Sequence, residues 1–388
     1  MCIKRFTQLT LVFAIVALIA GLSACDQGQQ LLVPAPPQMG DDGVEIIIGV
    51  DVPLTGPYAD PYGLPMQRGF ELAREEINQL GGAQITFITE DDQSTVEGAV
   101  EAFNKLIHQH GVSIITGIAL STQGAPTFPI AQENGVLCFS SASSAAGLSA
   151  IGDFIFRTGL TTDVVNPIGV RITQKKLGYQ RAALIYDDVD VYSTSSNEEL
   201  SEALAASDIE IVATETFQTG DTNFSAQLTR IMEANPDVIF FSGLGGERTK
   251  ILIQGRALGI PTSVLFITPD LDRGEVQTAG DAAEGAIAFT SWTSIANTPG
   301  NQAFIEKYRA KYGIEPERWA AQSYAALYIL AEAIAKAQST DAMAVRDAMA
   351  NIMDLDTILG QFSFNAVGDA IYDPSVLVVE NGELTIFE

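Results

Sequence analysis

The chain has 388 residues, of which 48 are acidic and 21 basic, and its formal net charge is −27. So acidic a surface repels nucleic-acid phosphates and anionic lipid headgroups, which argues against a nucleic-acid-binding function. A chain of this length exceeds the usual size of a single hydrophobic core, so we expect two lobes.

Residues 1–24 have the layout of an export signal, because two basic residues precede an apolar run that is too short for a comfortable membrane span. The run ends in Leu-Ser-Ala-Cys at positions 22–25, which resembles the lipobox of bacterial lipoproteins. We therefore expect cleavage before Cys25 and lipidation of that cysteine, with palmitate among its acyl chains. An ordinary signal-peptide cleavage site is the alternative. Residues 25–43 are rich in Gln, Pro and Gly and predict a flexible tether.

Cysteine and histidine usage excludes several kinds of site. Besides Cys25, the chain has Cys2 in the leader and Cys138 in a predicted strand, so no internal disulfide is expected. The only histidines, His108 and His110, would point about 200° apart on a helix and cannot grip a metal as an i, i+4 pair can. The sequence therefore predicts no metal site and no histidine-based catalytic triad.

Strands and helices alternate from residue 44 onward. Residues 44–50 form a nearly continuous apolar run, typical of a strand that is covered on both faces. Apolar residues at spacings of three and four predict a helix over 66–80, which the glycines at 81 and 82 end. A second strand over 85–89 and a helix over 99–107 follow by the same criteria.

Hydroxyl residues follow two consecutive predicted strands. The apolar runs at 112–116 and 136–139 flank a helix-length segment, which is the spacing of a βαβ unit. Because both strands of such a unit point the same way, Ser121 with Thr122 and the serines at 140–144 emerge at one carboxyl edge of the sheet. Open α/β sheets bind ligands along that edge. Hydroxyl and backbone N–H groups there suit a carboxylate, and nothing near them in sequence suits bond breaking.

The alternation then restarts, which predicts a second parallel sheet. The predicted strands are 182–186, 209–213, 238–241, 264–267 and 286–289, with helices at 164–177, near 200, 224–233 and 249–258. Helices at 302–312, 319–337 and 343–349 and a terminal β segment follow. We predict one lobe from residues 44–160 and 292–360 and the other from 161–291 and 361–388. The predicted fold class is α/β, with two similar open parallel-sheet lobes.

The glycine-rich turn at 242–247 lies between a strand and a helix, as in dinucleotide-binding proteins. It lacks the third glycine at the expected place, so a tight turn lining a cleft is the better interpretation. The chain has no Gly-x-Ser-x-Gly elbow, no complete nucleotide loop and no plausible catalytic base. We therefore predict a protein that is not an enzyme, with no catalytic residues and no cofactor.

Several motifs resemble those of the branched-chain amino-acid-binding proteins of ABC importers, and together they cover the chain from residue 44 onward. They include Pro-Leu-Thr-Gly-Pro-Tyr at 53–58, Glu-Asp-Asp-Gln at 90–93, Asp-Thr-Asn-Phe-Ser at 221–225 and Gly-Asp-Ala-Ala-Glu-Gly at 280–285. The resemblance implies the type I periplasmic-binding-protein fold, with two lobes joined by a multi-strand hinge. It also implies that Asp26, after the lipidated cysteine, favours retention on the inner membrane.

The resemblance also implies site residues. The ligand carboxylate would be held by Ser121 and Thr122 and by Ser143 and Ser144, where the family often has Ala-Thr at the second pair. The ligand ammonium would meet Asp270, where the family often has glutamate. Side-chain walls of the pocket would come from Tyr62, Tyr192 and Leu244, the last at a position that is tyrosine in the family.

The sequence thus favours a lipid-anchored binding protein outside the cell membrane that captures an amino acid, branched-chain or related, and delivers it to an ABC permease. A sensor of the same fold, which reports an amide, urea or amino acid to a receptor, is the alternative. The sequence leaves the identity of the solute and the oligomeric state open.

Overall fold

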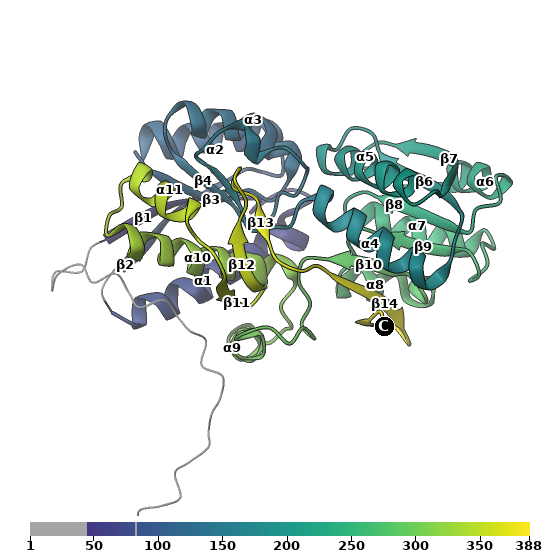
Figure 1. Ribbon diagram of the computed structural model, residues 1–388. Helices are drawn as coiled ribbons and strands as arrows, with labels where there is room; N and C mark the ends of the chain where they lie inside the picture. Colours follow the sequence, from purple (N-terminus) through teal and green to yellow (C-terminus); the bar gives the residue numbers. More distant parts are fainter. Residues whose placement is uncertain (1–44, 82–83) are drawn as a thin grey trace, which may run out of the picture.

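The computed structural model describes residues 45–81 and 84–388, and it divides into two α/β lobes that lie side by side (Figure 1). The predicted signal peptide, the lipidation site Cys25 and the tether lie outside the described residues. Within the described ranges, no helix is both long and apolar enough to cross a bilayer. The two-lobe α/β architecture confirms the predicted fold class.

The first lobe is built on a five-stranded parallel sheet in the order β2-β1-β3-β4-β5. Its strands are β1 (Glu45–Val52), β2 (Gln84–Asp91), β3 (Ile114–Gly117), β4 (Leu137–Ser140) and β5 (Ile155–Arg157). The two central strands β3 and β4 are fully buried, as their continuous apolar runs predict. The chain leaves β1 to one side for β2 and returns to the other side for β3, so the sheet has a switch point at the carboxyl end of β1.

Helices cover both faces of this sheet. One face carries α1 (Leu64–Gln79), α10 (Arg318–Ala337) and α11 (Ala342–Ala350), and the other carries α2 (Val96–Asn104) and α3 (Ser121–Glu133). The helices α1 and α10 approach closely because Gly69 has no side chain: a Cβ atom there would lie 2.2 Å from the carbonyl oxygen of Ala320. This packing holds α1 against α10, which lies about 250 residues later in the chain. It also fixes the position at which α10 begins, between the two lobes.

The second lobe has a seven-stranded sheet in the order β15-β14-β10-β9-β8-β6-β7, in which β14 and β15 are antiparallel additions to a parallel sheet. Its strands are β6 (Arg181–Asp187), β7 (Glu210–Phe217), β8 (Val238–Ser242), β9 (Leu265–Thr268), β10 (Ile287–Thr290), β14 (Ser375–Glu380) and β15 (Glu383–Ile386). Its helices are α4 (Thr162–Leu177) and α5 (Val191–Ala206) on one face and α6 (Ser225–Glu233), α7 (Gly245–Ala257) and α8 (Arg273–Ala279) on the other.

The chain crosses between the described lobes at residues 158–161, 291–300 and 372–374. After the second crossing, α9 (Asn301–Tyr312) packs Phe304 against Tyr324 of α10. The small sheet β11 (Leu355–Thr357), β12 (Gly360–Phe364) and β13 (Ala370–Ile371) follows.

The placement of residues 361–371 differs from the predicted lobe boundary, which assigned them to the second lobe. Phe364 packs edge-on against Phe139 and Phe156 of the first-lobe sheet, at ring distances of 5.8 and 5.0 Å. This aromatic contact holds the small sheet on the first lobe, so the chain re-enters the second lobe only after Ile371. The prediction was wrong here because periodicity shows that a strand exists but not which core covers it.

Asp51 places a carboxyl group in the core of the first lobe. Asp51, near the end of β1, is fully buried, and neither carboxyl oxygen has a hydrogen-bond partner within the described chain. Burial, and then the negative charge of Asp92, raise the pKa of Asp51 well above its usual range. Burial likewise raises the pKa of Asp92 to about 6. The folded protein therefore favours the neutral form of Asp51.

We expect Asp51→Asn to flatten the dependence of stability on pH. The folded-state pKa of Asp51 is raised, so its contribution is complete below the unfolded-state pKa of about 3.9 and declines as the pH rises toward the folded-state value. Over that interval the wild type should lose about 1.4 kcal/mol per pH unit relative to the variant. Urea unfolding at pH 5, 6, 7 and 8 measures this, with the exposed Asp188→Asn as control. Parallel curves for wild type and Asp51→Asn would show that this carboxyl is not buried as described.

Candidate ligand-binding site

The carboxyl edges of the two large sheets face each other across a cleft that contains two adjoining cavities. The first and the second each have a volume of about 20 Å³, so the closed lobes leave little free space between them. Four residues line both cavities, namely Ser144 from the first lobe, Tyr192 and Asp270 from the second, and Arg318 from the start of α10. The site is therefore built from both lobes.

Ser121 and Ser144 form the hydroxyl-rich wall of the first cavity. Ser121 begins α3, and its Oγ accepts hydrogen bonds from the backbone N–H groups of Ser144 and Ala145, at 3.1 and 3.0 Å. Since Oγ is the acceptor in both, its own hydrogen remains available to a ligand. Ser143 also lines the cavity, and its Oγ lies 2.8 Å from Oγ of Ser140. The structure thus brings the two predicted hydroxyl clusters together at one edge.

Thr122 does not lie at the expected carboxylate site. Its Oγ1 donates to Oδ1 of Asp190 at 2.7 Å and accepts from the backbone N–H of Val191 at 3.0 Å. Both partners lie at the start of α5 in the second lobe, and Thr122 lines neither of the two cavities. Its hydroxyl therefore joins the lobes directly in this closed arrangement.

We expect Thr122→Val to open the protein in the absence of ligand. The substitution removes a hydrogen bond to a carboxylate and leaves the Val191 N–H unpaired in the closed state only, a loss of about 1–3 kcal/mol. Small-angle scattering of the ligand-free protein should give a larger radius of gyration than the wild type. Thr229→Val, which removes only a bond within α6, is the control. An unchanged radius of gyration together with weaker solute binding would indicate instead that Thr122 contacts the carboxylate of the solute.

The predicted aromatic and aliphatic walls lie at the cavities. Tyr62, in a π-helical turn before α1, is buried, and its hydroxyl accepts from the Gly245 N–H at 2.9 Å, which also joins the lobes. Its ring lies 4.5 Å from that of Trp319. Leu244 lines the first cavity and Tyr192 lines both. Burial raises the pKa of both tyrosines far above the ordinary value, so both hydroxyls stay protonated.

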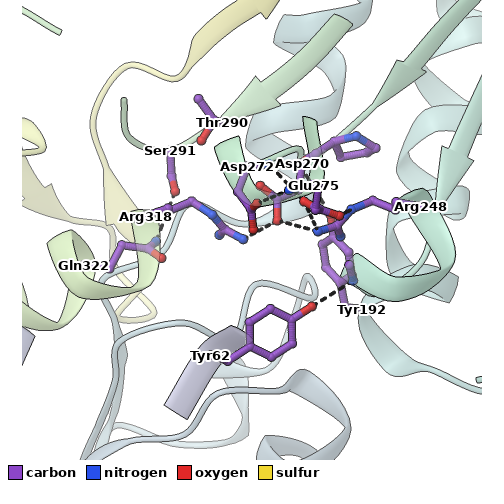
Figure 2. A network of polar contacts seen from close by, with 12 residues as sticks. Tyr62, Tyr192, Arg248, Asp270, Asp272, Glu275, Thr290, Ser291, Arg318 and Gln322 are labelled. Atoms are coloured by element: carbon purple, nitrogen blue, oxygen red, sulfur yellow. Dashed lines mark hydrogen bonds and ion pairs between the residues drawn. The ribbon is translucent and has the colours of Figure 1, made fainter. Parts of the chain in front are cut away.

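Asp270 lies in the cleft, but two arginines already surround its carboxylate (Figure 2). Its Oδ2 is 3.2 Å from Nη2 of Arg248 in the same lobe, and it also pairs with Nη2 of Arg318 from the opposite lobe. Arg248 in turn holds both carboxylate oxygens of Glu275, at 2.9 and 3.0 Å. Burial raises the pKa of Glu275 to about 8, and the charge of Arg248 opposes that shift.

Sequence reasoning missed both arginines. Arg248 lies in the first turn of α7 and Arg318 at the first position of α10, and each occupies a polar segment where a solvated arginine is the ordinary expectation. The site has no group of histidines, cysteines or acids that could hold a metal ion, a statement that covers residues 45–81 and 84–388.

The sequence profile of the periplasmic binding protein family matches residues 45–382. The Leu/Ile/Val-binding protein BraC3 of Rhizobium johnstonii is 28% identical over 330 residues, which cover 84% of this chain and 89% of the relative. The leucine-, isoleucine-, valine-, threonine- and alanine-binding protein of Pseudomonas aeruginosa is 27% identical over 350 residues, covering 88% and 89% of the two chains.

Two solved structures of binding proteins resemble this chain in fold as well. The crystal structure of the leucine-binding protein LivK from Thermotoga maritima superimposes with a TM-score of 0.83 at 26% identity, covering 88% of this chain and 98% of that one. LivJ from Streptococcus pneumoniae, the substrate-binding protein of a branched-chain amino acid transporter, was crystallised with isoleucine. It superimposes with a TM-score of 0.80 at 28% identity and covers 88% and 97% of the two chains. The chain is therefore a member of the periplasmic binding protein family, and a solute-binding protein of the ABC-transporter type rather than an enzyme.

Proposed function

We propose that this protein is a lipid-anchored extracytoplasmic receptor that captures a small apolar-tailed carboxylate, a branched-chain amino acid or a close analogue of one, and delivers it to an ABC importer. The observation that carries the proposal is the cleft itself, where serine hydroxyls of one lobe face charged groups of the other across two adjoining cavities. A solute that touches both walls stabilises the closed state through its differential contacts, and closure is what a permease recognises.

The residues proposed to hold the solute follow from their positions. Ser121 and Ser144 offer hydrogen-bond donors to the carboxylate, with Ser143 behind them. Tyr62, Leu244 and Tyr192 enclose the tail. Thr122 acts in closure rather than in binding.

Calorimetry against a panel of amino acids, their 2-oxo acids, amides and urea tests the binding function. We expect at least one carboxylate of the panel to bind, and Ser121→Ala to weaken that binding by about tenfold to 150-fold, the equivalent of one hydrogen bond to a charged group. Failure of every panel compound to bind would contradict the proposal.

The anchor is tested separately in cells. If Cys25 carries lipid, cells supplied with labelled palmitate incorporate the label into the wild-type protein, and Cys25→Ser abolishes the labelling. Absence of label from the wild-type protein would remove the lipid anchor from the proposal without affecting the solute-binding function.

A further inference from the structure

The side chain of Arg318 crosses the cleft and pairs with Asp270, the carboxylate expected to bind the ammonium group of an amino-acid ligand. The residue belongs to α10 of the first lobe, while Asp270 follows β9 of the second lobe. In Figure 2 the guanidinium of Arg318 extends toward the carboxylate of Asp270, which the Arg248 side chain approaches from the opposite direction. Among the described residues, Asp270 is the only carboxylate that lines either cavity.

The position of Arg318 is fixed by its surroundings. Its guanidinium lies 3.8 Å from the centroid of the Trp319 ring, within the range of a cation–π contact. The side chain is 13% exposed, so its charge is largely removed from bulk water. Trp319 in turn packs on Tyr62. A guanidinium held between an aromatic ring and a carboxylate is preorganised, and moving it would sacrifice both contacts.

Arg248 and Arg318 differ in how many of their nitrogen atoms have a hydrogen-bond partner. Arg248 uses Nε and Nη2 on Glu275, Nη2 also on Asp270, and Nη1 on the carbonyl oxygen of Gly243. Arg318 uses only Nη2, and its other nitrogens have no partner in the part of the chain that the structure describes. Because Arg318 lines both cavities, these donors face the space that a solute would occupy.

Charge balance at the cavities consequently favours an anion. Of the residues that line the first cavity, Arg248 and Arg318 carry positive charge and Asp270 alone carries negative charge. The remaining polar groups of the first cavity include the hydroxyls of Ser121, Ser144 and Tyr192, which can all donate. An ammonium group would enter a cavity whose charged lining residues already carry one positive charge in excess.

We propose that the solute of this site is a carboxylate without an ammonium group, such as a 2-oxo acid or an aryl carboxylate with an apolar tail, and that Arg318 determines this specificity. This inference rests on the proposed function and specifies the chemical class of the solute. The carboxylate lies among the serine hydroxyls and the free donors of Arg318, and the tail lies against Tyr62, Trp319 and Leu244.

An amino acid is rejected for a physical reason. If its ammonium displaced Arg318 from Asp270, a guanidinium would be left unpaired at a site that is largely out of water. If the ammonium instead bound Oδ1 of Asp270 and left Arg318 in place, it would share one carboxylate with two guanidinium groups. Either arrangement costs affinity that a 2-oxo acid of the same skeleton retains.

Calorimetry with matched pairs tests the inference: leucine against 4-methyl-2-oxopentanoate, phenylalanine against phenylpyruvate, and alanine against pyruvate, with benzoate as an aryl carboxylate. For the pair whose tail fits, we expect the acid without an ammonium group to bind at least about tenfold tighter. Arg318→Gln should reduce that ratio by about tenfold or more, because Asp270 becomes available to an ammonium. Arg318→Lys, which keeps the charge, should preserve most of the preference.

The control is Arg230→Gln, which removes an exposed arginine paired with Glu215 and should leave the ratio unchanged. An amino acid that binds as tightly as its 2-oxo acid would overturn the inference while leaving the proposed function intact, and so would a ratio that Arg318→Gln does not alter. If none of the seven compounds nor any other member of the broader panel binds, the proposed function itself fails.

Discussion

Replacing Arg248 by methionine is expected to lower the free energy of unfolding by about 3–5 kcal/mol, the cost of leaving buried charges without their partner. The side chain is 2% exposed and joins Asp270, Glu275 and the carbonyl oxygen of Gly243. Methionine fills a similar volume but supplies none of these contacts. Equilibrium unfolding in urea measures the loss, and Arg309→Met, which removes an exposed ion pair, should cost less than about 1 kcal/mol.

The effect of Arg248→Met should depend on pH. Burial already raises the pKa of Glu275 to about 8 with the arginine present, and removal of the arginine raises it further. A group with a raised folded-state pKa loses its stabilising contribution as the pH increases, so the variant should be less impaired at pH 5 than at pH 8. Adding Glu275→Gln should recover part of the loss at pH 8. A loss below about 1 kcal/mol at pH 8 would contradict this account of the network.

The second large effect is expected for Asp369→Ala, which leaves Arg157 unpaired in the core of the first lobe. Arg157 is fully buried, and its Nε and Nη2 donate to Oδ1 of Asp369 at 2.8 and 2.6 Å. Its Nη1 donates to the carbonyl oxygen of Ala145 at 2.5 Å, next to Ser144 in the site. We expect a loss of about 3–5 kcal/mol in the free energy of unfolding. We also expect weaker solute binding, because the serine loop, residues 140–145, depends on Arg157 for its position.

Urea unfolding and calorimetry with a bound carboxylate measure these two effects of Asp369→Ala. The control is Asp347→Ala, which removes an exposed carboxylate that pairs with Arg346 and should change stability by less than about 1 kcal/mol. If Asp369→Ala were as stable as this control, the buried ion pair would not hold the small terminal sheet and the serine loop together.

The sequence indicated those parts of the site that follow directly from the strand pattern. Ser121 and Ser144 come after consecutive parallel strands, and parallel geometry brings the ends of such strands to one edge. Asp270 follows a strand of the second lobe in the same way. Their positions at the cleft therefore depend on local periodicity and on the handedness of βαβ connections, both of which a sequence displays.

The remaining features depend on contacts between distant parts of the chain. The ion pair between Arg318 and Asp270 forms only when α10 returns to the first lobe and the lobes close, and neither residue carries a local sign of it. Thr122 likewise was expected to bind the solute, because the pattern cannot show that Asp190 lies opposite. The short helix α8 was not predicted either: it has seven residues, too few for a clear apolar period, although its capping box of Asp272 and Glu275 is a usable signal.

The central claim is that the two lobes close on a small carboxylate held by serine hydroxyls and Arg318 of the first lobe, while Arg318 pairs across the cleft with Asp270 of the second lobe. A crystal structure of the protein with the carboxylate that binds tightest in calorimetry tests this most directly. The account predicts the carboxylate within hydrogen-bond distance of Ser121 and of a free nitrogen of Arg318, with the pair between Arg318 and Asp270 intact. A solute bound outside the cleft, or one whose positively charged group has displaced Arg318 from Asp270, would contradict it.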